Sequence, residues 1–462
     1  MKILFIYKFE RVEPLGIMYL SSFLKKHGHE CYFIDLKFEK NFMKEIKKIS
    51  PDIIAYYIMT GKHKFYKQLN QELKKRFSFF SFFGGPHCTF FPEFINENGV
   101  DAICRGEGEL SFLELANNLE RKKDITKIKN LWVKIQGKVY QNEIRNLIEN
   151  LDTLPFPDRE LIHKYNHYRK MHRRIIMTTR GCPFNCTYCF NHSYNKIYQN
   201  KGQIVRRRSI DNVIKELKLI KERYFLKRFI FMDDVFIINP EWVFDFCKIY
   251  KREINVPFII NIRANLVNEE IIKALKNAGC ITVQYGIESG NEYIRNSIFK
   301  RNISTKQIID TGNIVNKYGL KSLCLNIIGS PDETIDMAFE TIAINIKCKP
   351  SYAQVSICQP FPGTELCEYA MKKGYFNGDV NSIEDTWHFK KSAIKMKDIE
   401  KFVRLRSLFS LCVKFPAIIP LVKILINLPL NRIYQLPWII HRSWCYFFKV
   451  KLIDLSELFI RE

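Results

Sequence analysis

Three cysteines in the middle of the chain, Cys182, Cys186 and Cys189, are separated by three and then two residues in a loop that also carries glycine and proline. Three thiolates in one such loop can converge on a metal centre. A cubane cluster has four irons, so three cysteines leave one iron open to bind a substrate. A structural zinc site needs a fourth ligand, which His192 could provide. The spacing therefore predicts a metal site, with an iron–sulfur cluster favoured and zinc as the alternative.

Further candidate catalytic or ligand-binding residues lie at the ends of apolar runs later in the chain. They are Asp233, Asp234, Arg263, Glu288, Ser289 and Gly329. Acidic and glycine residues at strand ends also make turns and helix caps, so turn formation is the alternative for each. In parallel β/α folds, however, active sites are built at the carboxyl ends of the strands.

The elements that must position these residues form an alternating series from Ile175 onward. Six apolar runs are typical of strands: 175–179, 228–232, 258–262, 282–286, 323–328 and 353–357. Helical patterns lie between them, including 209–224, for which Ser209 is the expected N-cap, and 269–278. Six β/α units predict a partial (β/α)6 barrel rather than a closed eightfold one.

A similar series occupies the first part of the chain. Its expected strands are 3–7, 31–34, 53–58, 79–83 and 102–104. Short apolar strands that alternate with helices predict a doubly wound, flavodoxin-like parallel sheet, whose ligands bind outside the carboxyl ends of the strands. The glycine-bearing turns at 84–87 and 105–109 lie at such ends.

The predicted domain organisation has four parts. They are a doubly wound domain at 1–145, a linker at 146–170, the partial barrel at 171–371, and a basic, mostly helical extension at 372–462. Pro155 and Pro157 interrupt helix and sheet in the linker. Between 401 and 453 the extension has nine Lys or Arg and no Asp or Glu. No run there reaches the roughly 20 apolar residues of a membrane-spanning helix.

With Tyr188 directly before its last cysteine, the Cys-x3-Cys-x2-Cys loop resembles the signature of the radical S-adenosylmethionine (SAM) superfamily. The resemblance implies that Cys182, Cys186 and Cys189 hold a [4Fe-4S] cluster and that SAM binds its open iron. One electron then cleaves SAM to methionine and a 5′-deoxyadenosyl radical.

The same resemblance implies contacts with SAM for residues at the strand ends. These are Tyr188, Asp233, Asp234, Arg263, Glu288, Ser289 and Gly329. A carboxylate suits the amino group of SAM and a guanidinium suits its carboxylate, while a glycine lets backbone approach the adenine.

The glycine-bearing turns of the first domain, at 84–87 and 105–109, resemble those of the cobalamin-binding domain found in one large radical SAM subgroup. That subgroup contains the anaerobic oxidative cyclase of chlorophyll synthesis and methylases of unactivated carbon. The residues implied to contact cobalamin are Pro14, Gly84, Gly85, His87 and Gly106. Histidine-ligated cobalamin is not expected, because the loop at 8–13 lacks the histidine that free-standing cobalamin domains carry. His87 is expected to be a turn residue rather than a cobalt ligand, and a domain that lost its ligand is the alternative.

Together these features predict an enzyme that functionalises an unreactive carbon, with methyl transfer from cobalamin as the leading reaction. Cyclisation, rearrangement and a radical SAM reaction without cobalamin are the alternatives. A further alternative, which is not an enzyme, is an iron–sulfur or zinc protein that binds nucleic acid. The formal charge of +25 suits a basic solvated surface. Nucleic acid is not an expected partner, because the chain has no recognisable RNA-binding appendage.

Fourteen cysteines scattered along the chain, without a signal-peptide pattern, predict reduced thiols and a cytoplasmic location. The expected partners are a small-molecule or lipid-like substrate and an electron donor such as flavodoxin or ferredoxin. Basic residues among Trp, Phe and Ile in 401–453 also predict peripheral contact with the inner face of the membrane. A helical cap packed on the barrel is the alternative for that segment.

Overall fold

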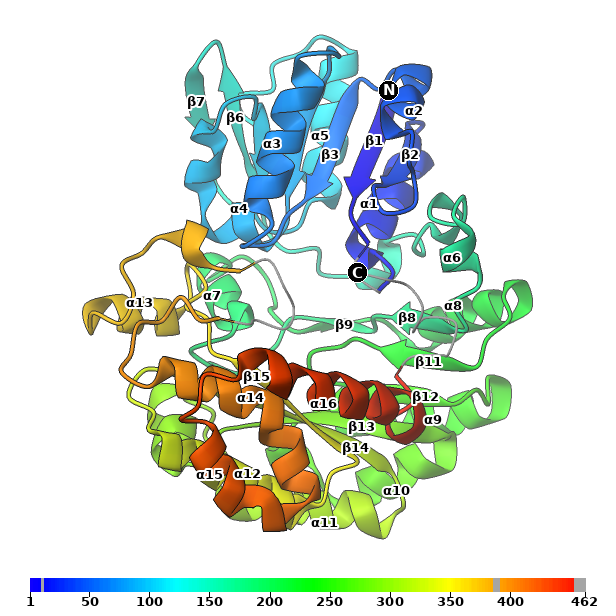
Figure 1. Cartoon of the computed structure of the whole chain (residues 1–462). Helices are drawn as coiled ribbons and strands as arrows, with labels where there is room; N and C mark the ends of the chain where they lie inside the picture. The colour runs from blue at the N-terminus through cyan, green and yellow to red at the C-terminus, as the bar shows by residue number, and fades with distance from the viewer. Residues whose placement is uncertain (10–11, 385–390, 453–462) are drawn as a thin grey trace. The chain divides into compact units, whose positions relative to one another are not determined.

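The computed structural model describes residues 1–9, 12–384 and 391–452, which form two compact units (Figure 1). The first unit contains residues 1–169 and 193–206. The second contains residues 170–192 and the chain from 207 onward.

The first unit is built on a seven-stranded sheet with the strand order β2-β1-β3-β4-β5-β6-β7. Pairing is parallel from β2 to β5 and antiparallel from β5 to β7. The strands are β1 (Lys2–Tyr7), β2 (Glu30–Asp35), β3 (Ile53–Tyr57), β4 (Phe80–Gly84), β5 (Ala102–Cys104), β6 (Leu131–Ile135) and β7 (Lys138–Gln141). The order 2-1-3-4-5 is flavodoxin-like, which confirms the predicted fold class. β6 and the edge strand β7 were not predicted.

Helices cover both faces of this sheet, as its apolar strands require. They are α1 (Leu15–Lys26), α2 (Phe42–Ile49), α3 (His63–Lys74), α4 (Pro86–Phe90), η1 (Pro92–Asn96), α5 (Glu109–Glu120) and α6 (Asn166–Arg169). Phe112 of α5 stacks on Phe82 with ring centroids 4.0 Å apart and meets Phe5 edge-on. Tyr66 and Leu73 of α3 belong to a separate core cluster with strand residues of the same sheet.

Most of the segment predicted as a linker packs on the first unit, which includes it as far as Arg169. It forms two short helices, η2 (Leu151–Thr153) and η3 (Arg159–Leu161), before α6. The hydroxyl of Tyr168 donates to Asp35 at 2.7 Å, and Arg159 pairs with Glu13 at 3.0 Å, with both ionic side chains buried.

Residues 193–206 belong to the same unit although they come later in the chain. Tyr198 is buried with Ile144 and Leu147. Arg206 forms a two-pronged ion pair with Glu107, at 2.9 and 3.1 Å.

The second unit is built on a six-stranded parallel sheet with the order β15-β14-β13-β12-β11-β8. The strands are β8 (Arg173–Ile176), β11 (Arg228–Phe231), β12 (Phe258–Ile262), β13 (Cys280–Glu288), β14 (Lys321–Ile328) and β15 (Tyr352–Ile357). The two-residue strands β9 (Thr179–Arg180) and β10 (Arg206–Arg207) lie outside this sheet. Each of the six predicted runs overlaps one of these six strands, which confirms the partial barrel.

The helices of the barrel series alternate with its strands. They are α7 (Phe190–Ile197), α8 (Ile210–Arg223), α9 (Pro240–Glu253), η4 (Ala264–Leu266), α10 (Glu269–Ala278), the π-helix η5 (Tyr293–Ile298), α11 (Thr305–Lys317), α12 (Ile335–Cys348), α13 (Glu365–Lys372) and η6 (Val380–Ser382). The side chain of Ser209 accepts from the N–H of Asn212, which confirms the predicted N-cap of α8.

The C-terminal extension is helical, as predicted. Its helices are α14 (Ile399–Lys414), η7 (Pro416–Ile418), α15 (Ile419–Leu425), α16 (Asn431–Trp444) and η8 (Cys445–Lys449). α14 packs on β15 and α12 and buries Phe402, Leu405 and Phe409. In the part of the chain that the structure describes, no helix is both long and apolar enough to cross a membrane. The predicted lipid-contact segment ends at Ile453, which lies outside the described residues.

Candidate active site

The three cysteines lie in the loop after β9, at the carboxyl end of the first barrel strand. Cys182 and Cys186 are buried, and Cys189 is partly exposed. Thr187 anchors the loop through two hydrogen bonds. Its N–H donates to the carbonyl of Phe299 at 3.1 Å, and its hydroxyl donates to the carbonyl of Ile298 in η5 at 2.6 Å. The cysteine loop is thereby fixed to the segment that follows β13.

Burial makes the thiols of Cys182 and Cys189 hard to ionise in the free protein. It raises the pKa of Cys182 to about 11 and that of Cys189 to about 12, and the neighbouring Cys186 adds to both shifts. A bound metal cation reverses this preference because it stabilises the thiolates directly. Buried, adjacent thiols are the ligands that iron–sulfur clusters use. This donor set therefore fits a [4Fe-4S] cluster.

His192, the fourth ligand of the zinc alternative, faces other partners. Its two ring nitrogens lie 3.2 Å from Oδ1 of Asn185 and 3.1 Å from Oε2 of Glu365. Across residues 1–9, 12–384 and 391–452, no three His, Cys, Asp or Glu side chains are arranged to hold a single metal ion. The described geometry gives the zinc alternative no support.

Arg263 follows β12 and reaches the cysteine loop. Its Nη1 lies 3.5 Å from Sγ of Cys186, and its guanidinium stacks over the ring of Phe184 at 3.8 Å from the centroid. Its Nη2 donates to the backbone carbonyl of Arg301. A cation held beside these thiols can pair with a substrate carboxylate. The predicted contact with the carboxylate of SAM stays a prediction.

Tyr188, Glu288 and Arg301 form a buried network close to the cysteine loop. Nη1 of Arg301 donates to the Tyr188 hydroxyl at 2.5 Å and to Oε1 of Glu288 at 3.0 Å, and Nη2 donates to the carbonyl of Gly286 at 2.8 Å. Burial raises the pKa of Glu288, and the Arg301 charge opposes that shift. Glu288 has a φ of 61°, a left-handed conformation that costs about 1–3 kcal/mol and that these bonds help to hold.

The two aspartates after β11 have different surroundings. Asp233 is fully buried and its Oδ1 accepts from the N–H and the hydroxyl of Thr178 at 2.9 and 2.8 Å, while burial raises its pKa. Asp234 is exposed. Surrounding protein raises its pKa, a hydrogen bond with Asn191 opposes that shift, and its charge in turn raises the pKa of Cys182. Asp233 therefore connects the segments after β8 and β11, and Asp234 is the aspartate open to a ligand.

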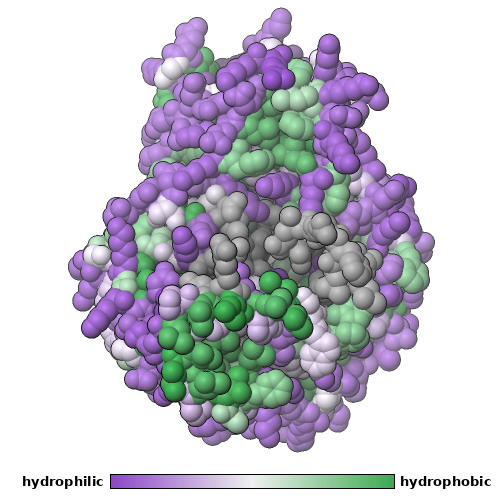
Figure 2. Space-filling view, viewed as in Figure 1, coloured by the Kyte–Doolittle hydropathy of each residue, from purple (hydrophilic) through white to green (hydrophobic). Residues whose placement is uncertain are grey.

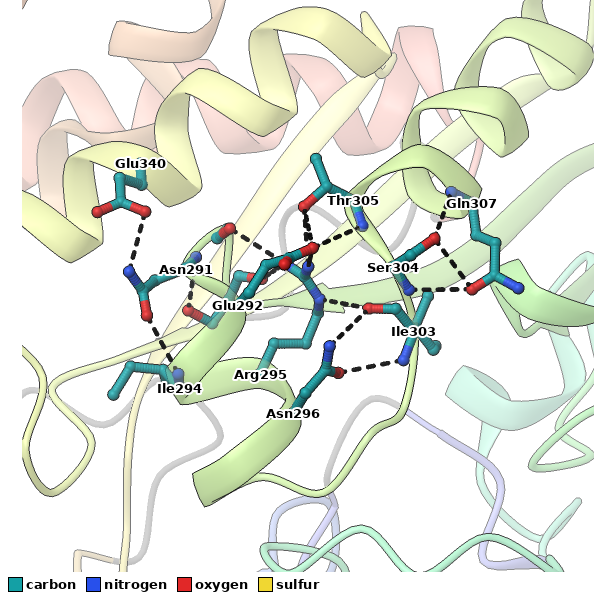
Figure 3. A network of polar contacts seen from close by, with 12 residues as sticks. Asn291, Glu292, Ile294, Arg295, Asn296, Ile303, Ser304, Thr305, Gln307 and Glu340 are labelled. Atoms are coloured by element: carbon teal, nitrogen blue, oxygen red, sulfur yellow. Dashed lines mark hydrogen bonds and ion pairs between the residues drawn. The ribbon is translucent and has the colours of Figure 1, made fainter.

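Arg295 of η5 holds the backbone that follows β13 (Figure 3). Its fully buried guanidinium donates to the carbonyls of Ser289 at 2.8 Å, Gly290 at 3.0 Å and Ile303 at 2.7 Å. At Gly290 a Cβ would lie 2.4 Å from the carbonyl oxygen of Glu340 in α12. The predicted site residue Ser289 is therefore positioned by its hydrogen bond from Arg295 and by the close packing of the next residue, Gly290, against the backbone of α12.

The turn after β14 begins at Gly329, whose φ of 76° favours glycine. A Cβ there would lie 3.3 Å from Ile399 and 3.5 Å from Phe402, so α14 packs directly on this turn. The buried carboxylate of Glu333 accepts from the N–H of Ser330 at 3.0 Å, and burial raises its pKa to about 8. The sequence pattern did not indicate Arg295 of the short helix η5 or Arg301 and Glu333 of loops, because a single charged residue there has no periodic signal.

The predicted cobalamin contacts lie at the carboxyl ends of strands in the first unit. Pro14 is buried directly before α1, and Gly84 ends β4 with open space where a Cβ would be. Gly85, with a φ of 103°, would place a Cβ 2.7 Å from a backbone carbonyl oxygen. Gly106, with a φ of 80°, would place one 1.9 Å from the hydroxyl of Tyr198. Close packing therefore requires glycine at 85 and 106 even without a ligand.

His87 is fully buried in α4. Its Nδ1 lies 3.0 Å from the hydroxyl of Thr60, and its ring stacks on that of His63 with centroids 4.3 Å apart. Burial and the neighbouring His63 lower the pKa of His87 to about 3, so the imidazole is neutral at pH 7. This placement agrees with a structural histidine, and its contact with cobalamin stays a prediction. Residues 10–11 of the histidine-free loop at 8–13 lie outside the described residues.

Comparisons with known proteins match both units. The model of the B12 binding domain matches residues 2–116, and that of the Radical SAM superfamily matches residues 176–343. The "Uncharacterized methyltransferase PH0819" of Pyrococcus horikoshii is 36% identical over 374 residues, which span 78% of this chain and 78% of that protein. This chain belongs to the radical SAM superfamily.

Two further proteins are similar to this radical SAM chain. The anaerobic magnesium-protoporphyrin IX monomethyl ester cyclase of Rubrivivax gelatinosus is 24% identical over 371 residues, 76% of this chain and 65% of that protein. The structure of the radical SAM methyltransferase TsrM from Kitasatospora setae, with cobalamin and a [4Fe-4S] cluster bound, has a TM-score of 0.67 at 14% identity, covering 80% of this chain and 78% of that one. The latter likeness shows the shared fold.

These findings confirm the predicted family, enzyme class and cofactors. The chain is a radical SAM enzyme of the cobalamin-dependent group, and its cofactors are a [4Fe-4S] cluster, SAM and cobalamin. Its barrel brings Arg263 to Cys186 and Arg301 to Tyr188 of the cysteine loop, and Arg263 also donates to the carbonyl of Arg301. Ser289 and Gly329 directly follow the neighbouring strands β13 and β14 but contact other partners.

Proposed function

We propose that this enzyme transfers a methyl group from cobalamin to an unreactive carbon of a small molecule. The observation that carries the proposal is the three-cysteine loop at the carboxyl end of the first barrel strand, with Cys182 and Cys186 buried, in a chain that also matches the B12 binding domain. The 36% identical relative named a methyltransferase supports the reaction type. When bound, the cluster supplies the electron that cleaves SAM and cobalamin supplies the methyl group.

In this proposal the three cysteines are the cluster ligands and the strand-end residues hold SAM. Arg263 orients the carboxylate of SAM, because its guanidinium is fixed beside Cys186 by stacking and hydrogen bonds. Asp234 binds the amino group, because it is the exposed member of the aspartate pair. Buried Asp233 supports the backbone at the same strand ends.

Three further strand-end residues complete the proposed SAM site. Glu288 accepts a ribose hydroxyl or the amine, held in place by Arg301 and Tyr188. The backbone of Ser289 and Gly329 contacts the nucleoside part of SAM, since the two residues directly follow neighbouring strands of the same sheet. All of these groups bind or orient SAM and exclude water.

In the first unit we propose that Pro14, Gly84, Gly85, His87 and Gly106 surround cobalamin. They lie in loops at the carboxyl ends of the strands, where doubly wound domains bind their ligands. With its low pKa, His87 would shape the pocket as a neutral ring.

The finer features of partners and location are proposals as well. The substrate is a small molecule or a lipid-like one, and an electron donor of the flavodoxin or ferredoxin kind reduces the cluster. The segment 401–453 makes peripheral contact with the inner face of the membrane. The acid-free composition of that segment supports the membrane contact. Nucleic acid is not a proposed partner.

A radical-mediated cyclisation is the second candidate, because the chain also resembles the magnesium-protoporphyrin cyclase. Methyl-labelled SAM separates the two reactions. Label that appears in a product bearing an added methyl group supports methyl transfer, whereas an unlabelled product with a new ring supports cyclisation.

The test of the cluster site is alanine substitution at Cys182, Cys186 and Cys189 in anaerobically reconstituted protein. Each variant should lose bound iron, the broad visible absorbance of the cluster and reductive SAM cleavage. The matched control is Cys247→Ala, because Cys247 is a buried core thiol of the same unit outside the cysteine loop. A triple variant that still cleaves SAM, or wild-type protein that retains zinc instead of iron, would contradict the proposal.

The test of the cobalamin site uses Gly84→Trp, because Gly84 has open space where a side chain would start. Gly85→Trp would collide with the backbone, so it tests folding as much as binding. Gly84→Trp should prevent retention of cobalamin after desalting while iron content and SAM cleavage persist. Bound cob(II)alamin in the wild type should lack nitrogen hyperfine splitting from an imidazole, because no histidine follows β1. Wild-type protein that retains no added cobalamin would refute this site.

A further inference from the structure

Large apolar side chains that are exposed to solvent are concentrated in one short segment of the second unit. Eleven of the nineteen such side chains among the described residues lie between Phe415 and Phe448, under a tenth of the chain. Figure 2 shows apolar residues gathered on the face where Figure 1 places α15 and neighbouring helices of the extension. Soluble proteins rarely expose an apolar patch of this kind unless it binds something.

α16 has a packing face and a second, unused apolar face. Tyr434 is 4% exposed and lies on the packing face. Ile433, Leu436 and Ile440, at spacings of three and four residues, are 64%, 63% and 62% exposed, and Trp444 continues their stripe. The stripe is therefore apolar surface in excess of what attaches the helix to its unit.

α15 adds exposed apolar residues to the same region. Leu421 and Ile424 are 57% and 64% exposed, whereas Val422 of the same helix is buried. The hydroxyl of Tyr434 donates to the carbonyl of Leu425 at 2.8 Å, which ties the end of α15 to the start of α16. The docking surface is defined here as Leu421, Ile424, Ile433, Leu436, Ile440 and Trp444.

The segment that carries the docking surface has charges of one sign, because no Asp or Glu occurs between 401 and 453. Lys423 is exposed within α15, and Nζ of Lys449 lies 4.8 Å from the ring centroid of Trp444. The nearest acidic group to Lys423 comes from α12, where exposed Asp336 lies 3.9 Å from its Nζ. A second copy of the chain would bring the same positive charge to the same face, which disfavours a symmetric dimer there. An anionic bilayer offers both apolar interior and opposite charge.

We propose that the docking surface inserts into the interface of an anionic membrane and anchors the enzyme there. The apolar residues of α14 are not part of this anchor, because Phe402, Leu405 and Phe409 are buried against the barrel. The basic extension therefore has two functions, a packed cap in α14 and a lipid anchor in α15 and α16. The anchor is independent of the chemistry proposed above and holds whether or not cobalamin binds.

The test is flotation of the full-length protein with vesicles of phosphatidylglycerol and phosphatidylcholine, compared with vesicles of phosphatidylcholine alone. The wild type should float with the anionic vesicles and much less with the neutral ones. The triple variant Ile433→Ser, Leu436→Ser, Ile440→Ser should bind at least roughly tenfold more weakly, because apolar surface buried in lipid is lost. Lys423→Gln with Lys449→Gln should weaken binding about fivefold for each charge removed.

Phe225→Ser is the matched control, since Phe225 is 70% exposed in the same unit but lies outside the docking surface. It should float like the wild type. Far-UV circular dichroism and iron content should be the same in all variants. Unchanged flotation of the serine triple variant would overturn the proposal. A second outcome would also overturn the proposal. If the wild type failed to float and instead formed a concentration-dependent dimer that the triple variant abolished, a second copy of the chain would cover the surface.

Discussion

Replacing Arg295 by Met should destabilise the barrel unit by several kcal/mol. The guanidinium is fully buried and donates to three backbone carbonyls around the end of β13. Met fills a similar length of apolar space but donates no hydrogen bond. The carbonyl of Ile303 keeps Nδ2 of Asn296 as a donor at 3.2 Å, whereas those of Ser289 and Gly290 lose theirs. At about 1–3 kcal/mol for each unsatisfied buried acceptor, the loss is about 2–6 kcal/mol.

Urea unfolding measures the total loss, and hydrogen exchange of peptides spanning 289–305 locates it. Arg295→Lys should fall between the wild type and Arg295→Met, because an ammonium keeps the charge but cannot span the same fork of acceptors. The control is Arg252→Met at a side chain 72% exposed, where a change within about 0.5 kcal/mol is expected. If Arg295→Met were as stable as Arg252→Met and exchanged no faster at 289–305, the reasoning from buried acceptors would be refuted.

Two further changes test other buried contacts. Burial raises the pKa of Glu333 from 4.5 to about 8, so its contribution to stability is full below 4.5 and is lost as the pH rises through 8. Glu333→Gln should remove this pH dependence of stability, which thermal midpoints measured between pH 4.5 and 8 would show. If the midpoints of the variant fell with pH as those of the wild type do, the buried Glu333 would not be the cause. Gly290→Ala should lower the thermal midpoint, because its Cβ meets backbone at 2.4 Å, and Gly16→Ala in α1, with nothing within 4 Å, should add about 0.5–1 kcal/mol of stability. Equal midpoints for the two alanine variants would show that the close approach is relaxed in solution.

The sheets could be predicted because parallel strands covered on both faces are continuous apolar runs. Each run expected from the sequence overlaps a strand, and Ser209 caps α8 as its position suggested. β6 and β7 were missed because Lys134 lies within β6 and Lys138 begins β7, which leaves only short apolar runs. β7 is the edge strand and is partly exposed, so it needs less apolar sequence than a central strand.

Candidate site residues could be singled out from the sequence only where they lie at or shortly after the end of a strand. The cysteine loop, Asp234 and Glu288 are of this kind. Arg295 lies in the short helix η5 and Arg301 in a loop, and both bind partners that only folding brings close to them. The burial that distinguishes Asp233 from Asp234 is likewise a property of packing, since the two are identical in sequence terms.

Because residues 193–206 belong to the first unit, the two units cannot be separated or exchanged by a single cut in the chain. A barrel cut free near position 170 would carry away Tyr198 and Arg206 while leaving behind their partners, Leu147 and Glu107. Genetic recombination that exchanges the first domain between relatives must therefore exchange this inner segment too. Changes in 193–206 and around Glu107 are therefore expected to occur together where the first domain diverges between relatives.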